Sequence, residues 1–151
     1  MNQGSGNDPV ARARGVVQAE CAAVGRIADQ FDDSLAAVVD LMLRCDGHVL
    51  VTGTGTSRAV AQRFAHLLAC CGTAALPINA ADALHGGAGA ITERDVLYII
   101  SKGGQSDEVN RFAAIAKENG AHIIAQTENP DSPLARMSDV VFCIRTIGEV
   151  D

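Results

Sequence analysis

The chain has 151 residues, 48% of them hydrophobic and 20% charged, which fits one globular domain and excludes both a disordered chain and a membrane span of about 20 apolar residues. Its formal net charge of −6 has the wrong sign for attracting a nucleic-acid backbone, so no nucleic-acid partner is expected. Aromatic residues make up only 3%, and the five Cys include no C-x-x-C pair, so we expect neither a stacked-ring sugar platform nor a redox motif, and we expect a reduced, cytoplasmic protein. Residues 1–9 lack the features of a secretory signal and are expected to form a disordered tail.

Hydrophobic periodicity predicts the elements in chain order. Apolar positions recur at helical spacing from about Val10 to Arg44, which predicts one long helix or two helices broken near residues 32–34. Beyond this region, strands are predicted at 48–52, 74–78, 96–100, 122–127 and 140–145, and helices at 57–71, 79–84, 107–119 and 132–138. Residues 85–90 are so rich in Gly that a loop is expected.

The alternation of strands and helices predicts an α/β fold. Each strand is a nearly continuous apolar run, which is typical of a parallel sheet covered on both faces. Right-handed crossovers then give a three-layer α/β/α sandwich, and five strands favour the flavodoxin-like order 2-1-3-4-5. This order leaves a crevice at the carboxyl ends of the first and third strands.

Two loops rich in Gly, Ser and Thr, residues 53–57 and 101–106, follow those two strands and are expected to open on the crevice. Backbone N–H groups, hydroxyls and the positive ends of two helices suit a phosphate group. The simpler interpretation, that Ser57 and Ser106 are ordinary helix N-caps and the glycines serve tight turns, stays open. The expected phosphate and substrate ligands are Gly55, Thr56, Ser57, Ser101, Lys102, Gly103, Gly104, Gln105 and Ser106.

A dinucleotide site is the competing interpretation of the first loop, because Gly53 and Gly55 follow the first strand. Arg58 occupies the place of the third glycine, and the second strand ends at Asn79 without an acidic residue. The Walker pattern is absent too, and no residues have convincing metal-ligand spacing. We therefore expect no cofactor and no metal.

Taken together, these motifs resemble the sugar isomerase (SIS) domain, nearest to its arabinose-5-phosphate isomerase branch. The resemblance covers about Val10 to the last residue. It rests on VTGTGTS at 51–57, ALHG at 83–86, GAIT at 89–92, DVLYIIS at 95–101, GQSDE at 104–108 and GE at 148–149. It implies a crevice that binds a phosphosugar, in an isomerase, in the isomerase half of glucosamine-6-phosphate synthase, or in the sensory domain of a regulator.

Three positions depart from the isomerase branch. Thr56 stands where that branch usually has Lys, Gly103 where it has Ser, and Gln105 where it has Glu. A cation and a carboxylate are thereby lost, although Lys102 offers a positive charge in the second loop. The family domain also continues past residue 151, so the chain is expected to lack the C-terminal part of the domain.

An aldose–ketose isomerisation moves a proton between C1 and C2 through an enediol, which needs a base near neutral pH and a polar group for the developing oxyanion. His85 and Glu149 are the catalytic candidates. The alternatives are a loop-stabilising histidine and a solvated carboxylate. Two functions stay open: a phosphosugar isomerase, and a phosphosugar-binding module without catalysis.

A homodimer or homotetramer is also expected. The N-terminal helical region is apolar on more than one face, and a single α/β sandwich cannot cover all of it. Related SIS domains are dimeric or tetrameric and often share a site between subunits.

Overall fold

The structure, a computed structural model, describes residues 8–147. Contacts divide these residues into two compact units, one formed by residues 8–31 and 145–147 and the other by residues 32–144. The sheet and both Gly-rich loops belong entirely to the second unit.

The first unit is built on the helix α1 (Pro9–Ile27), followed by the 3-10 turn η1 (Ala28–Gln30). The carboxylate of Asp8 accepts a hydrogen bond from the N–H of Val10, so Asp8 caps the helix and Pro9 begins it, whereas the sequence predicts a disordered tail over residues 1–9. Residues 1–7 lie outside the described residues. The Gln30 side chain pairs with the backbone of Arg145: its Nε2 donates to the Arg145 carbonyl at 3.0 Å, and the Arg145 N–H donates to its Oε1 at 2.8 Å.

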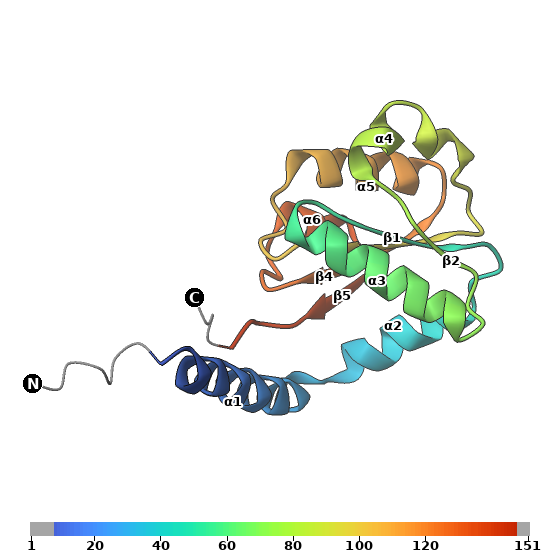
Figure 1. Ribbon diagram of the computed structural model, residues 1–151. Helices are drawn as coiled ribbons and strands as arrows, with labels where there is room; N and C mark the ends of the chain where they lie inside the picture. The colour runs from blue at the N-terminus through green and yellow to red at the C-terminus, as the bar shows by residue number, and fades with distance from the viewer. Residues whose placement is uncertain (1–7, 148–151) are drawn as a thin grey trace, which may run out of the picture. The chain divides into compact units, whose positions relative to one another are not determined.

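The second unit contains the five strands and the remaining helices (Figure 1). Its helices are α2 (Asp33–Leu43), α3 (Thr56–Cys70), α4 (Ala80–Leu84), the 3-10 turn η2 (Gly87–Ala90), α5 (Asp107–Glu118) and α6 (Pro133–Met137). Its strands are β1 (Val49–Gly53), β2 (Ala75–Pro77), β3 (Val96–Ile100), β4 (His122–Thr127) and β5 (Val140–Cys143). All neighbouring strands are parallel, and the order β2-β1-β3-β4-β5 confirms the predicted topology.

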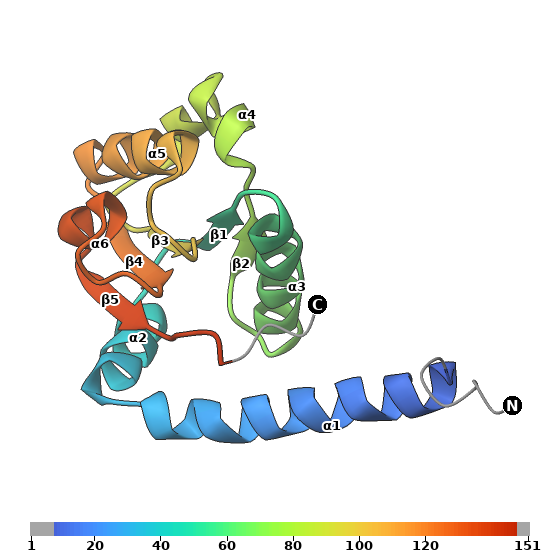
Figure 2. The same cartoon turned by 90° about the vertical axis from the view of Figure 1, so that its left-hand side faces the viewer.

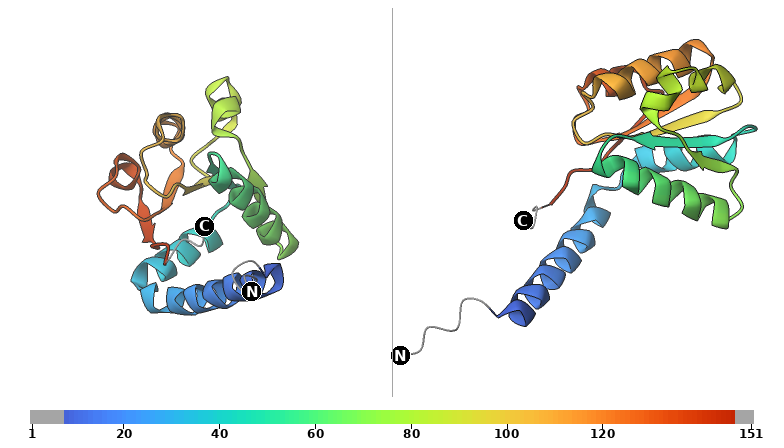
Figure 3. Two further views of the ribbon diagram at one scale, coloured as in Figure 1. Left: turned by 60° about the vertical axis from the view of Figure 1, so that its left-hand side comes forward. Right: turned by 45° about the horizontal axis from the view of Figure 1, so that its top comes forward.

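Helices cover both faces of this sheet, which makes the predicted three-layer sandwich (Figure 3). Because side chains alternate along a strand, Leu97 and Ile99 of β3 pack toward α4, α5 and α6, where Phe112 is fully buried. Val96 and Tyr98 pack on the other face, toward α2 and α3. The Tyr98 hydroxyl donates to Gln126 Oε1 at 2.9 Å, and burial raises the pKa of this tyrosine.

Two predictions about local structure are corrected. The Gly-rich pattern of residues 85–90 predicts only a loop, but Gly87–Ala90 forms the turn η2, with Ala88 buried. Small side chains allow this turn to lie close to α5, where Asn119 Nδ2 donates to the Ala88 carbonyl at 3.0 Å. The fifth strand ends at Cys143 rather than at residue 145, because the Arg145 N–H bonds to Gln30 instead of a neighbouring strand.

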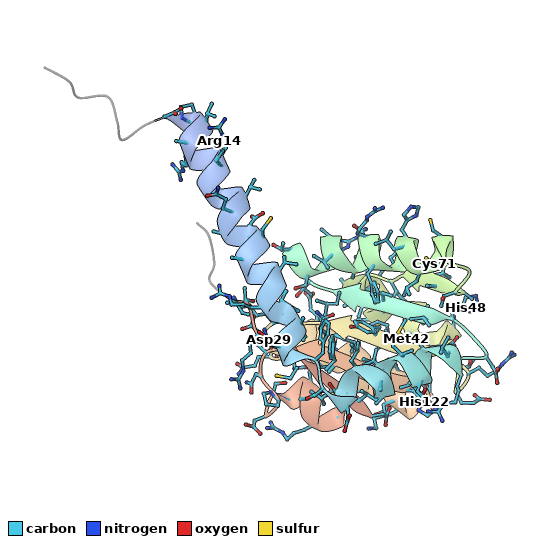
Figure 4. The ribbon with its side chains drawn as sticks, turned by 90° about the horizontal axis from the view of Figure 1, so that it is seen from below. Arg14, Asp29, Met42, His48, Cys71 and His122 are labelled. Carbon is cyan, nitrogen blue, oxygen red and sulfur yellow. The ribbon has the colours of Figure 1, made fainter. Side chains whose placement is uncertain are left out.

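The amino ends of the strands are fixed by the buried carboxylate of Asp95. It accepts the N–H of His48 at 2.8 Å and both the N–H and the hydroxyl of Thr92 at 2.8 and 2.9 Å. Burial alone would raise the pKa of Asp95, but these hydrogen bonds outweigh it and hold the pKa below its usual value. His48 and His122 mark this edge of the sheet in Figure 4, at the start of β1 and β4.

Candidate functional site

The two Gly-rich loops meet at the carboxyl edge of the sheet, which Figure 2 views end on. β1 and β3 are parallel neighbours, with Gly53 opposite Ile100. A Cβ added to Gly53 would lie 2.8 Å from the Ile100 carbonyl oxygen and 2.9 Å from the carbonyl carbon of Ser57. Only a glycine therefore lets the start of α3 rest against the end of β3. The predicted convergence of loops 53–57 and 101–106 is confirmed.

The two helices that follow the Gly-rich loops, α3 and α5, lack a side-chain cap. The N-cap of α3 is Gly55, at φ +55°, and that of α5 is Ser106, whose hydroxyl makes no capping hydrogen bond. The other four α-helices in the described part of the chain each have a capping side chain, from Asp8, Asp32, Asn79 and Ser132. The interpretation of Ser57 as an ordinary cap is therefore wrong, since Ser57 lies inside the first turn of α3. Ser106 does occupy the N-cap position of α5, but without a capping hydrogen bond from its side chain. The N–H groups of Thr56 and Ser57 at the start of α3, and those of the first turn of α5, can therefore bind an anion.

Gly104 determines the shape of the second loop. It is buried at φ +63°, where a Cβ would collide with the Ser132 side chain. Its N–H donates to the Ser101 carbonyl at 3.2 Å, and its own carbonyl accepts from the Leu134 N–H at 3.2 Å and from Asn110 Nδ2 at 3.3 Å. The Gly104 N–H is thus engaged within the loop, so the role of this residue is conformational.

The loop after β4 supports the loop after β3. Thr127 Oγ1 and the Glu128 N–H both donate to the Lys102 carbonyl at 2.9 Å, and the Ser101 N–H donates to the Gln126 carbonyl at 3.0 Å. Sequence reasoning missed Thr127 and Ser132 as supports of the site. The available signal was their position at the carboxyl end of β4 and in the segment after it, because parallel strands bring successive loops to one edge.

The remaining loop candidates differ in exposure. Ser101 is buried, Ser57 and Ser106 are half-buried, and five candidates are exposed. These five are Gly55, Thr56, Lys102, Gly103 and Gln105. Hydroxyls therefore line the deeper part of the site, and the positions that depart from the isomerase branch lie at its surface.

Of the two catalytic candidates, only His85 lies within the described residues, and the chain around it leads away from the loops. His85 is the exposed C-cap of α4, and the chain after it leads to η2, which Asn119 holds at the C-terminal end of α5. That twelve-residue helix begins beside the second loop and spans about 18 Å. Within residues 8–147, no hydrogen bond links His85 to either loop. Glu149 lies outside the described residues.

A cavity of about 190 Å³ lies beside the loops, between the first turns of α3 and the segment from β2 to α4. Sequence reasoning did not find it, because its polar residues come from two separate segments. Its lining residues are Val51, Arg58, Ala61, Gln62, Pro77, Ile78, Asn79 and Asp82.

Two further observations concern residues 8–147. No three His, Cys, Asp or Glu side chains cluster there in a way that would hold a metal ion. None of the helices in this range combines the length and the apolar character that a membrane crossing needs.

The chain is similar in sequence to a known protein family and to characterised members of it. The family model described as SIS domain matches residues 42–150. Arabinose 5-phosphate isomerase KpsF of Escherichia coli is 34% identical over 151 residues, which cover 98% of this chain and 46% of that relative. The chain therefore spans about half the length of the curated relatives it matches.

Two solved structures are similar as well. A structure from E. coli CFT073 in complex with arabinose 5-phosphate superposes with a TM-score of 0.90 at 26% identity, covering 100% of this chain and 79% of that one. The sugar isomerase domain of the RpiR transcription factor from Sphaerobacter thermophilus superposes with a TM-score of 0.74 at 25% identity, covering 87% and 77%.

Proposed function

This chain belongs to the SIS domain family, and from that premise we propose that it binds a phosphosugar and interconverts its aldose and ketose forms through an enediol, as an arabinose-5-phosphate isomerase does. The observation that carries the proposal is the pair of uncapped helix starts, α3 and α5, at one edge of the sheet with serine hydroxyls beside them. Uncapped N–H groups and the positive ends of two helices favour a phosphate group.

In this proposal, Ser57, Ser101 and Ser106 donate hydroxyl hydrogen bonds to the phosphate. The N–H of Gly103 and the first-turn N–H groups of α3 and α5 assist them. A hydrogen bond to a charged group contributes about 1.5–3 kcal/mol, so a few of them suffice to hold the ligand. The small side chains of the loops let the phosphate approach the backbone closely.

The proton transfer between C1 and C2 is assigned to His85, with Glu149 as the second acid–base group. Since α4 and η2 lead His85 away from the loops of its own chain, we propose that it serves the crevice of another subunit in a homodimer or homotetramer. An imidazole can accept and return the proton near neutral pH.

A phosphosugar-binding domain without catalysis is the second candidate. Thr56 and Gln105 favour it, because both are exposed at the site where the isomerase branch carries Lys and Glu. The similarity to the sugar isomerase domain of a transcription factor also favours it. Both candidates use the same phosphate site.

Turnover of a panel of aldose and ketose phosphates, beginning with arabinose 5-phosphate, separates the two. Isomerisation whose kcat/KM falls about tenfold or more in the Ser106→Ala variant supports the enzyme. Binding of sugar phosphates by calorimetry without turnover supports the binding domain. A chain that binds neither inorganic phosphate nor any sugar phosphate contradicts both.

A further inference from the structure

The first turn of α3 separates two spaces at the carboxyl edge of the sheet. Ser57 lies against Gly53, next to the Ile100 carbonyl and the proposed phosphate site. Arg58, the next residue, lines the cavity of about 190 Å³ on the side of β2. Its N–H donates to the Gly55 carbonyl at 3.1 Å, which fixes the backbone from which the guanidinium extends.

The lining of this cavity combines donors with an acceptor. Arg58 supplies only donors, Gln62 supplies both, and Asp82 supplies a carboxylate that Asn79 Nδ2 holds at 3.0 Å. Among residues 8–147, no ion pair occupies the Arg58 guanidinium. The Asp82 carboxylate would repel a second phosphate, whereas neighbouring hydroxyls can donate to Asp82 and accept from Arg58.

We propose that this cavity is the subsite for the hydroxylated carbon chain of the sugar phosphate, with Arg58 and Asp82 as its specificity-determining residues. The inference rests on the proposed function, because it needs the phosphate to be held at the neighbouring loops. At position 56, where the isomerase branch carries Lys, this chain has the uncharged Thr56. The positive charge of this turn comes instead from Arg58, two residues later. The charge then lies beside the sugar rather than the phosphate.

Calorimetric titration of the whole chain with inorganic phosphate and with arabinose 5-phosphate tests the subsite. The wild type should bind the sugar phosphate more tightly than inorganic phosphate. Arg58→Gln should lower the affinity for the sugar phosphate by about 10- to 100-fold, the range for a hydrogen bond to a charged group, and change the affinity for inorganic phosphate by less than about twofold. Asp82→Asn should act in the same direction.

Arg63→Gln is the matched control, because Arg63 is an exposed arginine of the same helix that does not line the cavity. It should leave both affinities unchanged, and thermal melting should show all three variants folded. If Arg58→Gln lowers the affinity for both ligands equally, Arg58 is a phosphate ligand and the subsite is overturned. If the variant loses affinity for neither ligand, the subsite is overturned as well. If the wild type binds inorganic phosphate and arabinose 5-phosphate with equal affinity, the subsite is overturned but the proposed function is not. A wild type that binds neither ligand overturns the proposed function as well.

Discussion

Gly53 and Ile100 approach so closely that a Cβ on Gly53 would lie 2.8 Å from the Ile100 carbonyl oxygen. This approach of β1 to β3 joins the two loops into one site. We therefore expect Gly53→Ala to destabilise the fold by about 1–3 kcal/mol, since backbone on both sides must shift. Urea unfolding measures this loss. Gly89→Ala is the control, because its Cβ would meet nothing within 4 Å; equal stability of the two variants would contradict the close approach.

Ser106 and Ser132 form a second matched pair. The Ser106 hydroxyl makes no capping bond, whereas Ser132 Oγ accepts the Ala135 N–H at 3.2 Å. Ser106→Ala should leave the melting temperature unchanged and weaken binding of sugar phosphate about tenfold or more, with no effect on the unphosphorylated sugar. Ser132→Ala should lose about 1 kcal/mol of stability. A similar loss of affinity for sugar and sugar phosphate in Ser106→Ala would exclude Ser106 as a phosphate ligand.

Asp95 should make stability depend on pH. Its pKa is lowered in the folded state, so its stabilising contribution is present above the unfolded value near 3.8 and is lost as pH falls through the lower folded pKa. The Asp95→Asn variant should therefore be less stable than the wild type at pH 7, and the gap should narrow below about pH 4. Urea unfolding of both proteins between pH 7 and pH 3 checks this. A gap that is constant with pH would mean that the charge of Asp95 contributes nothing.

His85 should be required for turnover but not for binding. Replacing it with Ala should lower kcat by about 10²–10⁴ with little change in ligand affinity, as for other acid–base groups. If its partner crevice lies in another subunit, mixing His85→Ala and Ser106→Ala chains at a substrate concentration below the Kd should give more activity than either variant alone, because some mixed sites contain both residues. Mixtures that show no such gain although mass spectrometry shows mixed oligomers would place His85 outside the shared site.

Gln105→Glu tests whether the chain is a weakened isomerase. This change restores the carboxylate that the isomerase branch carries, so turnover of arabinose 5-phosphate should rise. The measurement is kcat at saturating substrate, with affinity followed by calorimetry. Binding that persists without any turnover in this variant would favour the domain without catalysis.

Self-association should depend on α1. Val10, Val17 and Val24 are 56, 59 and 65% exposed and recur every seven residues, which gives this helix an apolar stripe of its own. Light scattering at micromolar concentration should give the mass of a dimer or tetramer, and Val17→Asp should lower it. Glu20→Asp, on the same helix, is the control that should not. A wild-type monomer would contradict the prediction.

The sequence by itself determined the sheet. Nearly continuous apolar strands separated by helical segments fix a parallel α/β fold, and the order of strands places the loops after β1 and β3 at one edge. The serines of these loops were found for the same reason, because in a parallel sheet the carboxyl ends of all strands share one side. The sequence left open whether the N-terminal region forms one helix or two, and the structure shows two, with Asp32 capping the second.

The tertiary structure alone decided which polar groups are already engaged. Whether Ser106 caps its helix, or whether the Gly104 N–H is free, depends on hydrogen bonds over a few ångströms that no residue pattern encodes. The same holds for the separation of His85 from the loops and for the cavity that joins Arg58 to Asp82. Periodicity assigns residues to elements and faces, but distances between side chains on different elements arise only when those elements pack together.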